Sequence, residues 1–333
     1  MKLKGLKFYF VICLCWSNFF LAQDIHWSQF NANPIFLNPA NAGDFNGDLR
    51  FVGNRRSQWR SVTEPFTTTS ISADKSFGNH FGAGVLFFDD VAGDGKFRTN
   101  EFQLNGSYKS NFGVDSASVF HFGAIIGVNY RQVNWGLLSF DSQYNGIGYD
   151  PSLPSNEAST IQKKSNLTLG FGAKFSHKFN KLKIEMSSGL FNINQPNQGF
   201  YGEKIKRDIR SNNSLKISYP LNSSFELIPS IQFQIQGKYQ SLLLGSNIKY
   251  IFTQTSLKYI AFFAGGWLRN KDAFILSFGA DYQNWFFGLS YDINTSSLNA
   301  ASNFRGGTEF SLRYIIRKYK PKNTMHRICP DYI

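Results

Sequence analysis

The sequence predicts an all-β fold, a transmembrane antiparallel β-barrel of about 14 strands. Three observations support this fold class. Segments of strand length alternate between apolar and polar residues, which places the apolar side chains on one face of each strand. Aromatic residues make up 17% of the chain, yet its mean hydropathy is only -0.27, as expected when only alternate residues meet lipid. Finally, the long connections between the predicted strands all follow odd-numbered strands.

The segment 273–292 carries the clearest alternation. Its apolar residues recur at every second position from Phe274 to Tyr282, and the pattern restarts at Trp285, after a polar Gln-Asn pair. This pattern predicts a hairpin with one apolar and one mostly polar face. The same reading along the chain predicts strands at residues 48–55, 67–76, 81–90, 98–109, 118–134, 166–179, 182–192, 211–219, 225–236, 239–252, 259–269, 273–282, 285–292 and 308–316.

Loop length separates a membrane barrel from a soluble β-sandwich, which is the alternative for an alternating sequence. The long predicted connections, 136–165, 193–210 and 293–307, all follow odd-numbered strands. Outer-membrane barrels have short periplasmic turns and longer outer loops. A sandwich has no reason to sort its loops in this way, so the loop lengths favour the membrane barrel.

The two ends of the chain lie outside the predicted barrel, residues 48–316. Residues 1–22 have a basic start, a short apolar centre and the small residue Ala22 at the expected cut, and predict a cleaved signal peptide. Residues 23–47 predict a non-strand arm, periplasmic or plug-like, and residues 317–333 a basic periplasmic tail. Cleavage would leave Cys329 as the only cysteine, which cannot form an internal disulfide.

The formal net charge of +13 does not predict nucleic-acid binding, because the basic residues gather in the leader and tail and are otherwise scattered. Contact with outer-membrane lipid fits this distribution better. The sequence has no metal-ligand spacing of His and carboxylates, no Gly-rich phosphate loop and no nucleophile elbow. The run 89–95 loosely resembles a calcium loop but lacks the downstream Glu, and is interpreted as an outer hairpin turn. We therefore expect no catalytic residue, no cofactor and no enzyme activity.

Two polar-aromatic stretches supply the candidate binding residues. In the arm, aromatic residues stand among two Asn-Pro steps. This pattern is typical of a segment ordered by packing on another surface, such as the inside of the barrel mouth; an ordinary N-terminal arm is the alternative. The second stretch, 54–60, ends the first predicted strand, and its alternative is an interfacial aromatic with arginines on lipid phosphates. The predicted partner-binding residues are His26, Trp27, Gln29, Phe30, Asn33, Pro34, Asn38, Pro39, Arg55, Gln58 and Trp59.

These stretches resemble the PorP/SprF family of type IX secretion system membrane proteins. The resemblance lies in His-Trp-Ser-Gln-Phe at 26–30, Asn-Pro at 33–34, Asn-Pro-Ala-Asn-Ala-Gly at 38–43 and Arg-Arg-Ser-Gln-Trp at 55–59. It continues in Ala-Gly-Asp-Gly at 92–95, the closing strand 306–314 and Cys-Pro-Asp-Tyr at 329–332. Trp27 stands where Phe is expected, and Arg56-Ser57 where the family often has one Arg before Asn. These departures leave the branch of the family open.

The resemblance implies a non-enzymatic outer-membrane protein of Bacteroidetes. Such proteins work with periplasmic type IX secretion ring subunits to secrete or anchor cargo with C-terminal sorting domains, including gliding adhesins. The arm and tail would then face the ring subunits, and the long outer loops would face the secreted cargo or adhesin. The alternative function is a porin-like diffusion channel, which has little use for an aromatic Asn-Pro arm.

Overall fold

The structure is a computed structural model that describes residues 24–58, 60, 64–113, 117–156, 161–200, 203–255, 258–296 and 302–317. The predicted signal peptide, Trp59 and tail residues 318–333 lie outside the described residues.

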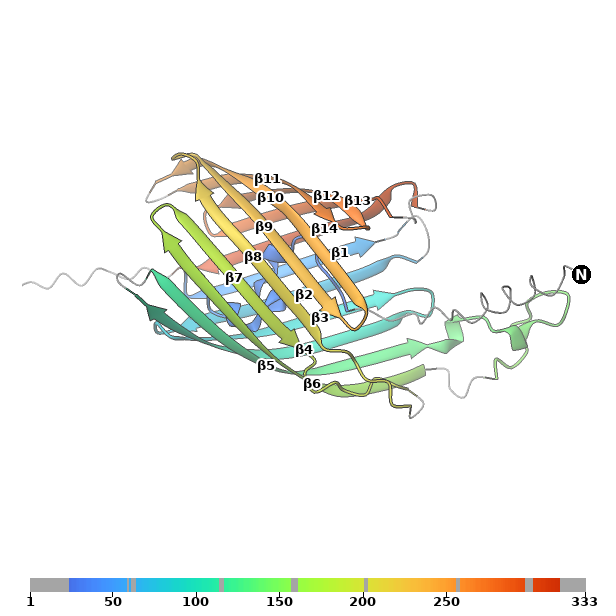
Figure 1. Ribbon diagram of the computed structural model, residues 1–333. Coiled ribbons are helices and arrows are strands. Elements are labelled where there is room, and N and C mark those ends of the chain that lie inside the picture. Colours follow the sequence, from blue (N-terminus) through green and yellow to red (C-terminus); the bar gives the residue numbers. More distant parts are fainter. Residues whose placement is uncertain are drawn as a thin grey trace, which may run out of the picture.

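Within these residues, fourteen strands form one closed antiparallel β-barrel (Figure 1). Each strand pairs with the next along the chain, and β14 pairs with β1 to close the wall. The predicted fold class is therefore confirmed, and so is the predicted strand number. The strands are β1 (Leu49–Gln58), β2 (Phe66–Phe77), β3 (Phe81–Ala92), β4 (Phe97–Phe112), β5 (Ser118–Asn134), β6 (Ile161–Phe179), β7 (Leu182–Phe191), β8 (Arg210–Pro220), β9 (Phe225–Gln236), β10 (Tyr239–Gln254), β11 (Tyr259–Arg269), β12 (Ala273–Tyr282), β13 (Trp285–Asn294) and β14 (Arg305–Ile316).

Several strands extend beyond their predicted ends. β6 begins at Ile161 rather than at residue 166, because it stays paired with β5 up to the Asn134–Ile161 pair. This extension contains Gln162, Lys163 and Lys164, so it lacks the apolar alternation that predicts the other strands. Periodicity finds the part of a strand that meets lipid, and it misses a paired extension beyond it.

The connections lie at two distinct rims. The rim that we call the long-loop end carries every connection after an odd-numbered strand, including 135–160, 192–209 and 295–304. Two short 3-10 helices, η4 (Trp135–Leu137) and η5 (Asp141–Gln143), lie in the first of these loops. The opposite rim, the short-turn end, carries only the connections 78–80, 113–117, 180–181, 221–224, 255–258 and 283–284. The predicted sorting of loop lengths is present in the structure.

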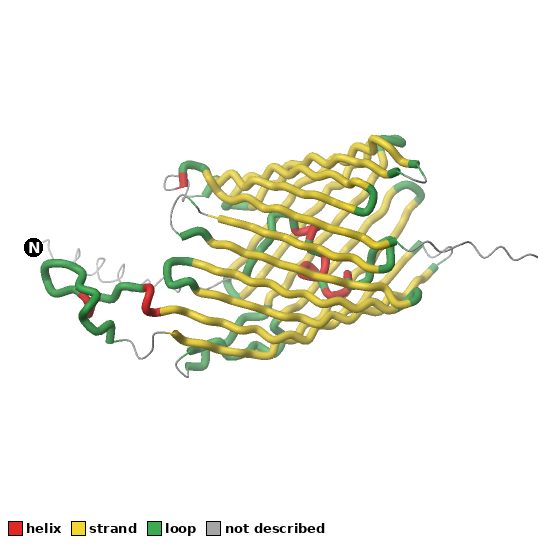
Figure 2. The backbone as a smooth tube through the Cα atoms, turned by 180° about the vertical axis from the view of Figure 1, so that it is seen from behind, coloured by secondary structure: helices red, strands yellow, loops and turns green. Residues whose placement is uncertain are grey.

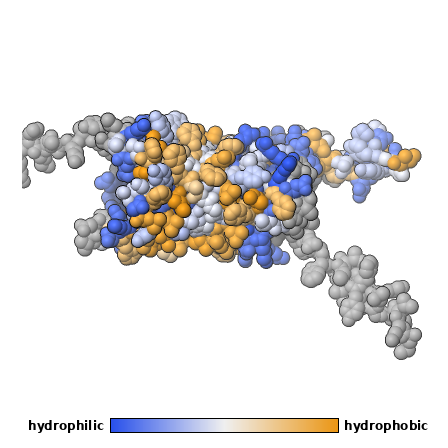
Figure 3. Space-filling view, turned by 90° about the horizontal axis from the view of Figure 1, so that it is seen from above, coloured by the Kyte–Doolittle hydropathy of each residue, from blue (hydrophilic) through white to orange (hydrophobic). Residues whose placement is uncertain are grey.

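The two faces of the wall differ as the alternation predicts. In β4, Phe102 and Leu104 are exposed on the outer face, whereas Glu101, Gln103 and Asn105 are buried on the inner face. On the face seen in Figure 3, exposed apolar residues lie across the middle of the barrel, with hydrophilic residues toward both rims. This inverted distribution, apolar outside and polar inside, is that of a membrane barrel.

The N-terminal arm, residues 24–47, lies inside the barrel lumen (Figures 1 and 2). It contains the short helices η1 (Phe30–Ala32), α2 (Pro34–Leu37) and η2 (Pro39–Asn41). Proline begins both α2 and η2, where its fixed φ and missing N–H are tolerated, so the two Asn-Pro steps start new turns. In the part of the chain that the structure describes, no helix is long and apolar enough to cross a membrane.

Candidate functional site

Two glycines of the barrel wall make room for the arm. Gly123 of β5 and Gly172 of β6 are neighbours in the strand register and face the lumen. A Cβ at Gly123 would overlap the backbone of Ala40, and one at Gly172 would overlap the side chain of Asn38. The Asn38 side-chain amide donates to the Ala173 carbonyl at 3.0 Å, so the arm reaches the backbone of the wall itself.

Apolar side chains of the arm pack against the wall on two sides. Phe30 packs edge-on to Trp267 of β11, with ring centroids 5.5 Å apart, and joins a cluster that includes Ile275 of β12. Trp27 and Phe36 belong to a second cluster with residues of β3. Because these strands lie on different sides of the barrel, the arm bridges the lumen.

Charged residues of the wall hold Ser28, in the first part of the arm, in what we call the Asp292 cluster, which consists of Ser28, Arg56, Arg269, Asp292 and Glu309. The Asp292 carboxylate accepts from Arg56 Nη2 at 2.8 Å and Arg269 Nη1 at 3.1 Å. The Ser28 hydroxyl donates to the same carboxylate at 2.7 Å, and its backbone N–H donates to Glu309 at 2.7 Å. Arg56 also donates to the His26 carbonyl. All five residues of the cluster are buried.

A second polar contact fixes the start of the arm near the long-loop end. Arg207, in the β7–β8 loop, forms ion pairs with Asp24 at 2.9 Å and with Glu101 of β4 at 3.0 Å. The Asp24 backbone N–H donates to Gln236 at 2.7 Å. Burial alone would raise the pKa of the Asp24 carboxyl, but the guanidinium groups of Arg207 and Arg210 outweigh it and lower this pKa.

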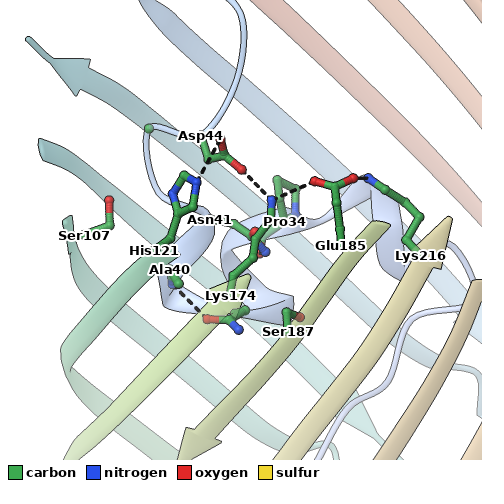
Figure 4. A network of polar contacts seen from close by, with 12 residues as sticks. Pro34, Ala40, Asn41, Asp44, Ser107, His121, Lys174, Glu185, Ser187 and Lys216 are labelled. Carbon is green, nitrogen blue, oxygen red and sulfur yellow. Dashed lines mark hydrogen bonds and ion pairs between the residues drawn. The ribbon is translucent and has the colours of Figure 1, made fainter. Parts of the chain in front are cut away.

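A third polar contact, which we call the Asp44 network, fixes the end of the arm (Figure 4). The Asp44 carboxylate accepts from Lys174 Nζ, which also pairs with Glu185 of β7 at 3.0 Å. Glu185 in turn pairs with Lys216 of β8. Burial would raise the pKa of Asp44, but the positive charges of Lys174 and His121 outweigh it and lower the pKa to about 2.

Beside this network, Arg50 and Asp74 form an ion pair that also binds the backbone of the arm. Arg50 Nη2 donates to Asp74 at 2.7 Å and to the Asn41 carbonyl of the arm at 3.0 Å. The Gly43 backbone N–H donates to the same Asp74 carboxylate at 2.7 Å. The arm is therefore tied to the wall near its beginning at Asp24 and Ser28, in its middle at Asn38 and near its end at Gly43 and Asp44.

Asp44→Asn should weaken the docking of the arm in a pH-dependent way. The pKa of Asp44 is about 2 in the folded protein and 3.8 for the free side chain. A carboxyl with a depressed folded pKa stabilises the fold fully above its unfolded pKa and loses this effect as pH falls through its folded pKa. We expect the free energy of unfolding of the variant to be about 1–2 kcal/mol lower than that of the unchanged protein at pH 7. This difference should vanish as the pH falls to about 2 and below.

Urea unfolding in detergent micelles, followed by tryptophan fluorescence at several pH values, measures this difference. Asp141→Asn, in the exposed β5–β6 loop, is the matched control and should leave the unfolding curve unchanged at every pH. A difference of the same size at pH 7 and pH 2 would contradict the role of the Asp44 charge.

The structure brings most of the predicted partner-binding residues together in the lumen. Trp27, Phe30, Asn33, Asn38 and Pro39 are buried, and His26, Gln29 and Pro34 are half-buried in the same arm. The other predicted residues of the 54–60 stretch are not part of this packing. Gln58 is half-buried at the end of β1, Arg55 is exposed on the outer face of β1, and Trp59 lies outside the described residues.

Sequence reasoning missed the wall residues that hold the arm. Arg56, Arg269, Asp292 and Arg207 are separated in sequence, and nothing local marks them as partners. The available signal was their register, because Arg269 and Asp292 are charged residues at inward positions of predicted strands, and Arg56 follows the predicted end of the first strand by one residue. Arg207 lies in a predicted loop, where no register applies.

A cavity of about 850 Å³ lies at the long-loop end of the lumen, beside the start of the arm. Asp24 and His26 of the arm line it, together with Arg131, Phe97 and residues of the β7–β8 loop. Arg131 lies over the Phe97 ring at 4.5 Å from its centroid. Among the described residues, no three His, Cys, Asp or Glu side chains come together to hold a metal ion.

The fold and the site define a membrane β-barrel whose lumen holds its own N-terminal arm. The sequence profile of the family described as type IX secretion system membrane protein PorP/SprF matches residues 19–314. The chain belongs to this family, which confirms the resemblance found in the sequence.

Solved structures share the barrel fold at low sequence identity. A FadL homologue of Pseudomonas aeruginosa is 12% identical with a TM-score of 0.50, and the match covers 85% of this chain and 94% of that chain. The toluene transporter TbuX of Ralstonia pickettii is 9% identical with a TM-score of 0.51, covering 86% of this chain and 93% of that chain. No curated protein matches this chain. At such identities the structural similarity extends to the fold alone.

Proposed function

We propose that this protein is a non-enzymatic outer-membrane component of the type IX secretion system. In this role it couples periplasmic ring subunits to the secretion or surface anchoring of cargo that carries C-terminal sorting domains. The observation that supports this function best is the arm inside the lumen of a barrel that belongs to the PorP/SprF family. A barrel occupied by its own chain suits an anchoring and coupling component better than an open pore.

The proposed orientation follows from the two rims. Membrane barrels place short turns in the periplasm and long loops outside. The short-turn end would therefore face the ring subunits, and the basic residues that follow β14 would lie on that side. The long-loop end, with the 135–160 and 192–209 loops, would face the cargo or adhesin.

In this proposal the arm residues predicted to bind partners act when the arm moves. Their side chains are buried or half-buried against the wall, so a periplasmic subunit can reach them only after the arm leaves its seat. Polar and charged contacts hold the arm, and a partner that offers competing charges at the Asp44 network could release it.

Affinity purification from native envelopes tests this function. An affinity tag is inserted at the exposed Gly146 of the β5–β6 loop, and the proteins that copurify with the barrel in mild detergent are identified. We expect periplasmic ring subunits or a large secreted adhesin to copurify. A chain truncated after Arg317 is the matched control, and it should lose the ring subunits but keep the cargo. If the folded, tagged barrel purifies alone from both strains, the coupling function is wrong.

The alternative, a porin-like diffusion channel, is supported by one feature, the cavity of about 850 Å³ at the long-loop end. For continuous diffusion the solute would then have to pass the docked arm. Conductance distinguishes this function from the first, because a channel must carry steady current with the arm in place.

A further inference from the structure

The outer wall of the barrel has a groove of about 760 Å³ across β14, β1 and β2 and the adjacent strands β12 and β13. Its lining on the lipid-facing side includes Gly53, Arg55, Ile71, Leu289, Phe310 and Leu312. The groove exists at this point because Gly53 has no side chain where its neighbours carry large apolar groups. A Cβ at Gly53 would meet no atom within 4 Å, so the space beside it is open.

One charged side chain, that of Arg55, lines this apolar groove. Arg55 is exposed on the outer face, and it makes no hydrogen bond or ion pair with any residue that the structure describes. It therefore differs from Arg98, an exposed arginine of β4, which pairs with Asp89 at 2.6 Å. An unpaired guanidinium on the lipid-facing side of a barrel is unfavourable unless it reaches the interface or an anionic partner.

The position of Arg55 along β1 brings its guanidinium within reach of the lipid head groups. Arg55 pairs with Phe310, and the next outward row toward the long-loop end joins Ser57, Thr308 and the exposed Tyr291. Aromatic residues at that level are typical of the interface girdle of a membrane barrel. Arg55 is three residues from the end of β1 at Gln58, which places its Cα about 8 Å below the rim for a tilted strand. A long side chain spans most of this distance by extending toward the interface.

We propose that this groove is a binding site for one phosphate-bearing membrane lipid. An acyl chain of the lipid lies along the apolar groove at Gly53, and its phosphate accepts hydrogen bonds from the Arg55 guanidinium. Phosphate suits this position because a guanidinium binds it with two parallel hydrogen bonds. The groove supplies the shape and Arg55 supplies the charge, so both parts are needed for a specific site. This inference does not depend on the secretion function.

Two substitutions test the two parts of the site separately. Gly53→Leu fills the groove, and the open space at Gly53 lets the barrel fold with the larger residue. Arg55→Gln removes the charge and keeps a polar side chain of similar length. Gly106→Leu is the matched control for the first, because Gly106 is another outward glycine with open space, on β4. Arg98→Gln is the matched control for the second.

Native mass spectrometry of the purified, delipidated barrel with added phosphatidylglycerol measures the binding of individual lipids. We expect one tightly bound lipid on the unchanged protein. Binding should be about tenfold weaker for Gly53→Leu, because the groove for the acyl chain is filled, and for Arg55→Gln, because one charge-assisted contact to the phosphate is lost. Both controls should bind like the unchanged protein. Diacylglycerol with the same acyl chains and inorganic phosphate alone should each bind weakly, because each occupies only one part of the site.

The same measurements can overturn the proposal. Heat-modifiable migration in SDS gels first establishes that every variant is folded. Undiminished lipid binding by either folded test variant, or equal loss in its control, excludes a specific lipid site here. If Arg55→Gln keeps the lipid but loses a copurifying envelope protein, the groove is a protein interface instead.

Discussion

Removal of residues 24–43 should convert a nearly silent barrel into a conducting one. The arm bridges the lumen between apolar clusters on two sides of the wall and is tied by polar contacts along its length. Barrels of this size leave an aqueous channel only where no chain segment fills the lumen. In planar lipid bilayers we expect the unchanged protein to carry little current, and the shortened chain to carry about tenfold more or higher.

A second variant distinguishes two causes of increased current, an open lumen and a damaged barrel wall. Gly123→Val with Gly172→Val keeps the arm in the chain but places side chains where Asn38 and Ala40 now lie. Valine is favourable in strands, so the wall should form while the arm is excluded. Gly106→Val, on the outer face, is the control and should carry as little current as the unchanged protein. High steady current from the unchanged protein would contradict the plugged lumen and favour the diffusion channel.

Asp292→Asn should cause the largest loss of stability from a single substitution. The side chain of Asp292 is 4% exposed, and its carboxylate is shared by Arg56 and Arg269, which are 2% and 3% exposed. Removal of one partner from a buried ion pair leaves an uncompensated buried charge, at a cost of about 3–5 kcal/mol. Asparagine keeps the size of the side chain, so the loss reports the charge and not a cavity.

Urea unfolding in micelles measures the stability, and chymotrypsin cleavage at the arm aromatics measures its release. Asp281→Asn is the matched control, because Asp281 also pairs with an arginine of the wall, Arg313, but that arginine is 33% exposed. The control should lose about 1 kcal/mol or less and should keep the arm protected. Equal losses in both variants would mean that the Asp292 cluster does not hold the arm.

The sequence predicted the wall of this barrel far better than its interior. Each strand that meets lipid must alternate between apolar and polar residues. The residues around Phe102 and Leu104 therefore predict both the strand and its outer face from local sequence alone. Strand ends at the long-loop end were less predictable, because β6 continues there with the polar run Gln162-Lys163-Lys164. That extension does not need an apolar face, so only its pairing with β5 identifies it as part of the strand.

The interior depends on contacts that no local pattern encodes. The arm stood out because its aromatic residues and Asn-Pro steps are unusual before a first strand. Its seat did not, because Gly123 and Gly172 look like any strand glycines until the register places them side by side. In the same way, Arg55 and Arg56 are adjacent in sequence, but adjacent residues of a strand point to opposite faces, so Arg55 is exposed on the outer face and Arg56 is buried in the lumen.

The arm also sets an order on how the protein folds. Its contacts join residues far apart in sequence, with separations of 281 positions for Ser28 and Glu309 and 212 for Asp24 and Gln236. Contacts of such high sequence separation form late and slowly, because a long loop must close before they stabilise anything. The wall, by contrast, consists of neighbouring hairpins and a single long-range closure between β14 and β1. We therefore expect the arm to dock only as the barrel closes around it. The first residues of the arm would then be among the last to reach their folded positions.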